Sequence, residues 1–133
     1  MTISTRGRYA LRVLVDIAEN GGDEYIAMKD VAARQEISLK YLERILPVLV
    51  SNGLIKGVHG KGGGYKLTRT PDKYPLDEIL RLTGDLDPMG CLENGGKPCQ
   101  RAKDCRTRPV WDKLNCLIND YLKSVTIKDL MKK

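Results

Sequence analysis

Several residue types that build active sites and membrane spans are scarce in this chain. Its 133 residues include no phenylalanine, one tryptophan and one histidine. The core must therefore be aliphatic, and no histidine-based nucleophile and base pair is evident. No apolar run approaches the roughly 20 residues that cross a bilayer, and the first residues lack the apolar stretch of a signal peptide. These absences argue against an enzyme and against a membrane protein, and we expect a cytoplasmic protein.

Positive charge is concentrated in one part of the chain. The formal net charge is +6, and residues 34–73 alone hold eight lysine and arginine side chains against three acidic ones. Concentrated positive charge attracts the phosphate backbone of nucleic acid and releases its counterions. An ordinary solvated surface also explains a basic run, so the charge has to be weighed together with the motifs that it accompanies.

The order of the expected elements indicates the fold class. Apolar periodicity and capping residues predict helices, and short strand-like stretches around glycines predict a hairpin. We therefore predict a mainly α protein with a small β-hairpin wing, a winged helix-turn-helix plus a long C-terminal helix. The expected helices cover residues 5–20, 28–35, 38–52, 76–83 and 109–124, the strands cover 54–56 and 65–68, and a capped turn begins at Thr126.

Two of these helices carry apolar residues at spacings of three and four, which place them on one face. We expect both faces to be buried in the core. In the first helix the face consists of Ala10, Val13, Leu14 and Ile17, and in the helix that begins at the cap Ser38 it consists of Leu42, Ile45, Leu46, Leu49 and Val50.

The last long helix has a continuous apolar seam that suits packing against a partner helix. We expect this seam to form a homodimer, with burial against the same chain as the alternative. Its residues are Val110, Leu114, Leu117, Tyr121 and Val125.

Two helices joined by a tight turn and followed by a basic hairpin are typical of a winged helix-turn-helix, whose second helix enters the major groove. With the apolar face buried, Ser38, Lys40, Tyr41 and Arg44 remain on the outer face or the leading turn. Arginine and lysine donate to guanine, and serine donates or accepts. Glu43 either accepts from a cytosine amino group or orients Arg44.

The hairpin tip carries no acidic residue, and its glycines let the backbone approach phosphates or the floor of the minor groove. His59, Gly60 and Lys61 are the expected contacts. A glycine-rich loop also cradles nucleotide phosphates in other folds, but the spacings of the P-loop and dinucleotide motifs are absent.

These segments resemble the IscR/NsrR/CymR family of bacterial regulators. The matching motifs are STRGRYA at residues 4–10, ISLKYLE at 37–43, GKGGGY at 60–65 and VTIKDL at 125–130. The resemblance implies a winged-helix homodimer that binds palindromic operator DNA, and several members hold an iron–sulfur cluster. One departure is His59, where IscR-like proteins often have arginine, and it puts minor-groove insertion in doubt.

The four cysteines are Cys91, Cys99, Cys105 and Cys116. In a reducing cytoplasm they are better interpreted as thiols or metal ligands than as a disulfide framework. Cluster-binding relatives carry three cysteines in the corresponding loop, although their commoner first gap is five residues and here it is seven. The resemblance therefore implies an iron–sulfur cluster on Cys91, Cys99 and Cys105, because thiolates are the soft ligands that it requires.

The sequence does not identify the fourth ligand of such a cluster. IscR-like proteins place a histidine where this chain has Arg108, and some relatives use a carboxylate at the position of Arg8. Cys116 is the obvious substitute, and Glu93, Asp104, a small thiol or solvent are the others. A thiol or disulfide switch, a zinc site and inert thiols are the alternatives to a cluster.

Three divisions of the chain follow. They are a DNA-binding domain over residues 1–83, a cysteine-containing sensor loop over 84–108, and a dimerisation helix with a final turn over 109–133. A regulator controlled by a partner protein, as in some CymR-like relatives, remains an alternative. A protein–protein adaptor without DNA binding is the alternative from a different class.

Overall fold

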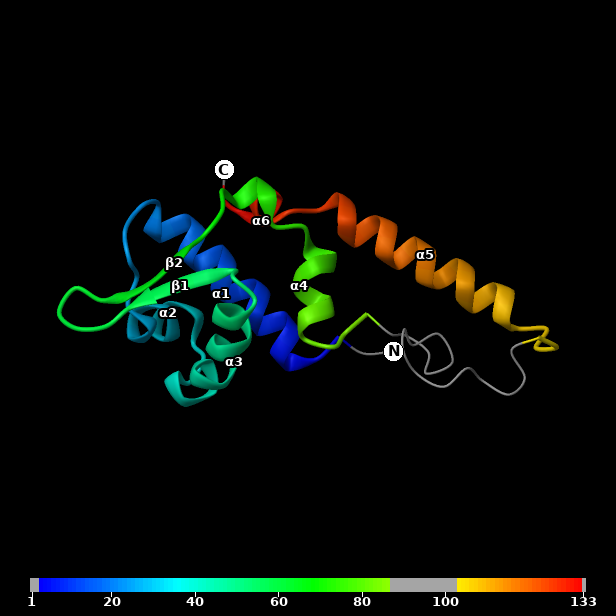
Figure 1. Cartoon of the computed structure of the whole chain (residues 1–133), viewed down its shortest axis with the longest axis horizontal. Helices are drawn as coiled ribbons and strands as arrows, with labels where there is room; N and C mark the ends of the chain where they lie inside the picture. The colour runs from blue at the N-terminus through cyan, green and yellow to red at the C-terminus, as the bar shows by residue number, and fades with distance from the viewer. Residues whose placement is uncertain (1–2, 87–102, 133) are drawn as a thin grey trace.

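The elements follow the order expected from the sequence, and the predicted fold class is confirmed. The computed structural model describes residues 3–86 and 103–132. Figure 1 shows a two-stranded hairpin whose tip projects from one end of the helical body, while one long helix extends toward the opposite end. The elements are α1 (Thr5–Gly21), α2 (Met28–Gln35), α3 (Leu39–Ser51), β1 (Ile55–Val58), β2 (Gly64–Leu67), the 3-10 turn η1 (Pro71–Lys73), α4 (Leu76–Leu82), α5 (Arg108–Ser124) and α6 (Ile127–Leu130).

Hydroxyl side chains begin three helices as predicted. Ser4 and Ser38 each accept a hydrogen bond from the backbone N–H three residues further on, at 2.9 and 3.1 Å. Thr126 forms a capping box with Asp129 at the start of α6. Each cap satisfies a backbone donor that the helix itself leaves unpaired, and its loss typically costs about 1 kcal/mol.

The predicted apolar faces of α1 and α3 form a large part of the core. All four residues of the α1 face are at most 1% exposed, and four of the five α3 residues are buried. Val50 was predicted to be buried and is instead 43% exposed. It follows the fully buried Leu49 in the last turn of α3 and faces a hollow beside the hairpin, so Val50 lies at the edge of the apolar face rather than within the core.

The single fully buried aromatic residue of the described core is Tyr74. Its hydroxyl donates to the Leu54 carbonyl at 2.6 Å and accepts from the backbone N–H groups of Thr68 and Arg69 at 3.0 and 3.1 Å. A buried tyrosine needs such partners for its polar end. Tyr74 thus connects the segment after the hairpin to the chain just before β1.

The hairpin is antiparallel, with Ile55 opposite Leu67. It is attached to the loop before α2 by two backbone hydrogen bonds of 2.8 Å between Ile26 and Tyr65. Gly64 allows this approach, because a Cβ there would lie 2.3 Å from the Ile26 carbonyl oxygen. The hairpin therefore has a fixed position beside the helix pair α2 and α3.

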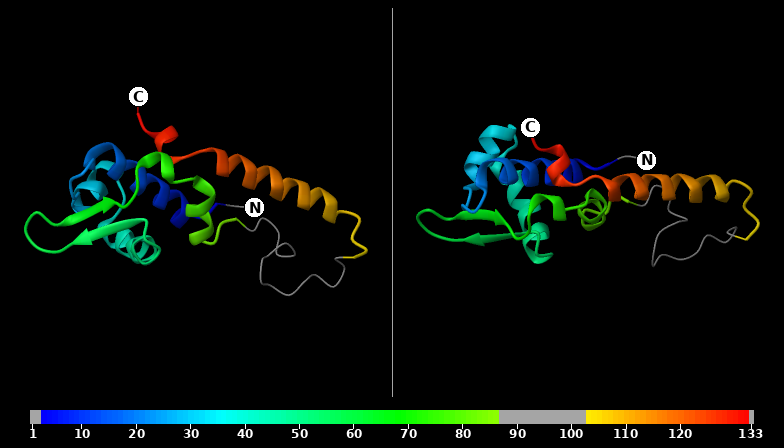
Figure 2. Two further views of the ribbon diagram at one scale, coloured as in Figure 1. Left: turned by 45° about the horizontal axis from the view of Figure 1, so that its top comes forward. Right: turned by 90° about the horizontal axis from the view of Figure 1, so that it is seen from above.

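Helix α5 projects as an arm, and the views in Figures 1 and 2 agree on this. None of its residues is buried. Beyond it the chain returns to the core, where Ile127 is fully buried and its N–H donates to the Tyr74 carbonyl at 3.0 Å. Within residues 3–86 and 103–132, no helix combines the length and apolar character needed to span a bilayer.

Candidate nucleic-acid interface and cysteine segment

The outer face of α3 carries the residues that were predicted to contact DNA. Lys40, Glu43 and Arg44 are exposed, because the apolar face of the helix packs against α1, α2 and β1. Ser38 is exposed at the start of the helix, and its oxygen already accepts the capping bond, which leaves its O–H able to donate. The structure thus brings these four side chains to one end and one face of α3.

Tyr41 differs from its neighbours because it is half-buried. Its ring packs edge-on against the ring of Tyr9 in α1, with the centroids 5.4 Å apart. The Arg12 guanidinium lies over the other ring, 5.2 Å from the Tyr9 centroid. Sequence reasoning gave no role to Tyr9 or Arg12, because only the packing of α1 beside α3 brings them to this place.

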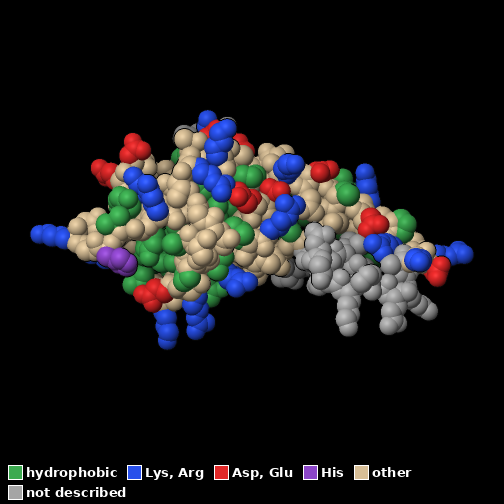
Figure 3. All heavy atoms as spheres, in the orientation of Figure 1, with side chains coloured by type: hydrophobic (Ala, Val, Ile, Leu, Met, Phe, Trp, Pro, Cys, Tyr) green, Lys and Arg blue, Asp and Glu red, His purple; other side chains and the backbone are tan. Residues whose placement is uncertain are grey.

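The tip of the hairpin places His59, Gly60 and Lys61 in solvent. Gly60 has φ 97°, a conformation that favours glycine. A Cβ on Gly63 would lie 2.3 Å from the Val58 carbonyl oxygen, so the tip is closed too tightly for another residue there. Figure 3 shows basic side chains projecting from this end of the molecule and from the edge formed by α3.

An apolar hollow of about 440 Å³ separates α3 from the hairpin. Three large apolar side chains on its lining are exposed, Leu39 by 41%, Val50 by 43% and Val58 by 49%. Figure 3 shows apolar side chains gathered between the two elements. Leu39 and Val58 were not predicted to contact DNA, although each is next to a residue that was, Leu39 to Ser38 and Lys40 and Val58 to His59.

Two of the eight basic side chains counted in residues 34–73 form ion pairs with acidic side chains. Arg34 contacts Asp16, which is 1% exposed, at 2.7 Å, and this hydrogen bond raises the pKa of Arg34. Arg69 makes two bonds of 2.6 and 3.0 Å to Glu78, which raise the pKa of Arg69. The charge offered to solvent by this stretch is therefore smaller than its sequence indicates.

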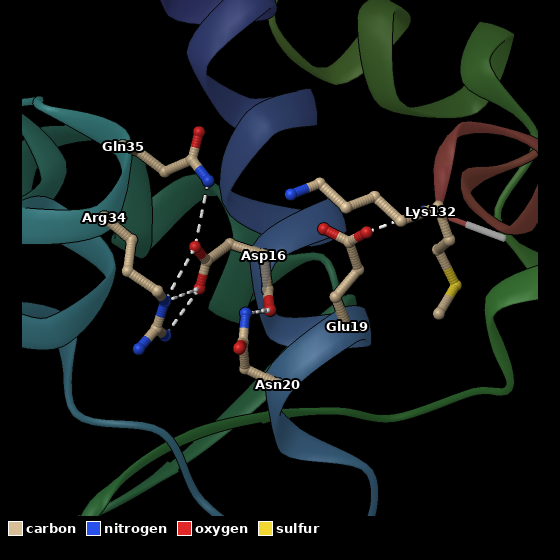
Figure 4. Close-up of a pocket in the computed structure, with 7 residues that line it drawn as sticks. Asp16, Glu19, Asn20, Arg34, Gln35 and Lys132 are labelled. Carbon is tan, nitrogen blue, oxygen red and sulfur yellow. Dashed lines mark hydrogen bonds and ion pairs between the residues drawn. The ribbon is translucent and has the colours of Figure 1, made fainter.

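The Asp16 carboxylate is the centre of a polar network beside α1 (Figure 4). It accepts from Arg34 and, at 2.9 Å, from the side-chain amide of Gln35 at the end of α2. The Glu19 carboxylate accepts from the backbone N–H of Lys132, so the C-terminal segment closes the other side of a hollow of about 590 Å³. Because Asp16 is buried, its partners in α2 hold that helix in place against α1.

A second carboxylate, Asp85, joins the start of α1 to the chain after α4. It accepts from the backbone and hydroxyl of Ser4, both at 2.8 Å, and from the Thr83 hydroxyl at 2.6 Å. A Cβ on Gly7 would lie 2.0 Å from its Oδ2 atom. Burial alone would raise the pKa of Asp85, but the bonds from Thr83 and Ser4 outweigh it and lower the pKa. We call this group of four residues the Asp85 clasp.

Two of the four cysteines can be placed. Cys105 is half-buried just before α5, with its sulfur 3.2 Å from the Thr107 hydroxyl, and Cys116 is exposed on α5. Arg108, at the position where IscR-like proteins have histidine, pairs with Asp112 at 3.7 Å. Cys91 and Cys99 lie outside the described residues, so the predicted ligand set stays a prediction.

Comparison with known proteins bears on this arrangement. A family model described as Rrf2, iron-dependent transcriptional regulator, matches residues 3–133. The chain belongs to the Rrf2 family of transcriptional regulators. It is 35% identical over 133 residues to the protein rrf2 of Nitratidesulfovibrio vulgaris, covering 99% of this chain and 88% of that protein. It is 32% identical to the transcriptional regulator IscR of Erwinia tasmaniensis, covering 98% of this chain and 79% of that one.

Solved structures of this Rrf2 family have the same fold. IscR from T. potens superimposes with a TM-score of 0.77 at 32% identity, covering 98% of this chain and 85% of that chain. CymR of B. subtilis, described as a global cysteine regulator, superimposes with a TM-score of 0.79 at 31% identity, covering 98% and 95%. The predicted recognition as an IscR/NsrR/CymR-type regulator is confirmed, and relatives named as transcriptional regulators agree with the prediction that the chain is not an enzyme.

Proposed function

We propose that this Rrf2-family chain is a cytoplasmic repressor that binds operator DNA through α3 and the wing. The observation that carries the proposal is the exposed polar face of α3, where Lys40, Glu43 and Arg44 stand opposite an anchored apolar face. An α-helix fits the major groove, where lysine and arginine donate to guanine and glutamate accepts from cytosine. The exposed wing residues 59–61 then lie against phosphates or the adjoining minor groove.

The exposed apolar residues beside α3 add a further contact to this proposal. Leu39 and Val58 line the hollow between the recognition helix and the wing. Apolar side chains recognise the methyl group of thymine in the major groove. We expect Leu39, at the first position of α3, to favour thymine at one base pair of the operator.

The operator is proposed to be palindromic because the chain is proposed to act as a homodimer. On α5, Val110 is 59%, Leu117 54% and Tyr121 67% exposed, and they follow one another along one side of the helix. Large apolar side chains in such a row mark an interaction surface. A second copy covers them with the same face of its own α5, and the resulting two-fold axis requires a two-fold symmetric site.

The proposed sensor is an iron–sulfur cluster held by Cys91, Cys99 and Cys105, with Cys116 as the candidate fourth ligand. The donor chemistry fits, because thiolates are the ligands that such clusters require. The described part of the segment is also basic, with Lys103 and Arg106 exposed, which would offset the negative charge of a ligated cluster. A bound cluster would make the segment responsive to iron–sulfur supply and to oxidative or nitrosative stress.

A regulator without a cluster, controlled by thiol oxidation or by a partner protein, is the second candidate. One observation favours it: the residue that would replace the histidine ligand is Arg108, which is engaged with Asp112 and cannot bind iron. Both candidates share the DNA-binding surface and differ only in the sensor.

Anaerobic purification distinguishes a regulator that holds an iron–sulfur cluster from one that does not. The expected result is a coloured protein with matched iron and sulfide per chain, lost in Cys91→Ala, Cys99→Ala and Cys105→Ala. A colourless protein that cannot be reconstituted with iron and sulfide would overturn the cluster and favour the thiol or partner mechanism.

The salt dependence of duplex binding tests the DNA-binding part separately. Fluorescence anisotropy should give a steep fall of log K with log salt. A flat dependence would instead point to a protein–protein adaptor.

A further inference from the structure

The side chain of Arg12, on α1 beside the recognition helix α3, is held in one orientation by its neighbours. Its Nε donates to the side-chain oxygen of Gln35 at 3.1 Å, and its NH2 group donates to the backbone oxygen of the same residue. Its guanidinium carbon lies over the ring of Tyr9, and that ring contacts Tyr41 of α3. Arg12 is nevertheless exposed. Two contacts with Gln35 and one with a ring therefore orient a cation that still faces solvent.

The orientation of Gln35 is itself determined by the buried Asp16. The Gln35 amide nitrogen donates to the Asp16 carboxylate at 2.9 Å, as Figure 4 shows, so its oxygen must point the other way, toward Arg12. A carboxylate only accepts, and the two ends of an amide are therefore not interchangeable here. The polar network that holds α2 against α1 thus also positions Arg12.

This arrangement leaves part of the guanidinium unused. A guanidinium has five N–H donors in a rigid fork. Gln35 takes two of them, and within residues 3–86 and 103–132 no hydrogen-bond acceptor is found for the other three. One turn earlier on α1, Arg8 is exposed as well. The flank of α1 next to α3 therefore presents positive charge and free donors near the side chains proposed to enter the groove.

We propose that Arg12 binds a DNA phosphate at the edge of the major groove that α3 enters. The proposal rests on the DNA-binding function proposed above. Arginine donors match phosphate oxygens, and an arginine held in place loses less conformational entropy on binding than a free one. A phosphate contact positions the protein without distinguishing sequences. Arg12 is thus the contact that aligns α3, and Tyr9 and Gln35 are positioning residues that act through it.

The test is the salt dependence of binding to two fluorescent duplexes of unrelated sequence. Arg12→Gln should weaken binding to both duplexes by the same factor, about fivefold to tenfold for each protomer at about 0.1 M salt. It should also reduce the slope of log K against log salt by about 1 for each bound protomer. Arg12→Lys keeps the positive charge but loses the planar set of guanidinium donors. Its salt slope should therefore stay near that of the wild type, and its affinity should fall less than that of Arg12→Gln.

Two further variants test whether the location of the charge and the orientation of the Arg12 side chain matter for DNA binding. Lys123→Gln removes the same charge from an exposed site on α5 and should change neither affinity nor slope. Gln35→Met removes the amide that orients Arg12 and keeps its charge, so affinity should fall with the slope retained. Thermal unfolding of each variant is measured alongside, because Arg12 also bonds to the end of α2; a partly unfolded sample lowers the active fraction and not the slope.

The outcomes are distinguishable. An Arg12→Gln variant with a wild-type slope would overturn the inference, because the residue would then act only in holding α2. An equal change in Lys123→Gln would overturn it too, since general charge would explain the loss. If the wild-type protein itself shows no salt-dependent binding, both the proposed function and this inference fail.

Discussion

Helix α1 and helix α5 are both amphipathic 17-residue helices, but the apolar face of α1 is buried and that of α5 is exposed. On α1 the face is closed off from solvent by α2, α3, α4 and α6, and Leu14 is 0% exposed. On α5 no residue is buried and Tyr121 is 67% exposed. An amphipathic pattern therefore shows that a helix needs an apolar partner, and it does not say whether the same chain supplies it.

The largest expected effect is the loss of stability when a buried apolar side chain is truncated. Leu42→Ala in α3 should reduce the free energy of unfolding by about 2–5 kcal/mol, because a fully buried leucine leaves a cavity. Leu117→Ala on α5 is the matched change and should cost much less in dilute protein, since Leu117 is 54% exposed. Urea denaturation of both variants measures this, and equal losses would contradict the contrast.

The next largest effect concerns the exposed apolar residues of α5 and the dimer that they are proposed to form. Leu117→Glu should weaken the proposed dimer by about 2–4 kcal/mol, the range of an interface hot spot, because it places a charge in the seam. Folding of the isolated chain should change little. Sedimentation equilibrium measures the dimer, with Lys123→Glu on another side of the helix as the control. A dimer of unchanged affinity would show that α5 is not the interface.

A smaller effect concerns the Asp85 clasp. Gly7→Ala would gain about 1 kcal/mol from helix propensity at an open site. Here the new Cβ meets the Asp85 carboxylate, so we expect a net loss of about 1–3 kcal/mol, as in overpacked cores. The double variant Gly7→Ala with Asp85→Ala should recover part of it. Thermal unfolding gives the values, and a Gly7→Ala variant more stable than wild type would rule out the clash.

The smallest effect is a pH dependence from the same clasp. The pKa of Asp85 is below its usual value in the folded protein. A lowered pKa stabilises the fold above the pH where an unfolded aspartate titrates, about 3.9, and this contribution is lost as the pH falls through the folded-state pKa. Asp85→Asn should therefore be less stable than wild type at neutral pH, and the difference should shrink in acid. A constant difference from pH 7 to acid would contradict it.

Much of the fold could be predicted because its signals are local. The caps Ser4, Ser38 and Thr126, and the apolar spacing in α1 and α3, depend on residues within one or two turns. The exposed side of α3 followed from the same spacing, so Lys40 and Arg44 could be assigned to it from the sequence alone. The prediction for Val50 was wrong, because the spacing does not show how wide a part of the helix surface the neighbouring elements cover, and the adjacent Leu49 is buried while Val50 is not.

The sequence by itself determined the helices, their apolar faces, the glycine-rich hairpin and the Rrf2-type motifs, since each is encoded within a few neighbouring residues. Tertiary structure alone decided which charges remain available. It neutralised Arg34 with the buried Asp16 and Arg69 with Glu78, and it brought Asp85 against Gly7. These contacts join residues far apart in the chain, so they depend on how the helices cross rather than on any local period.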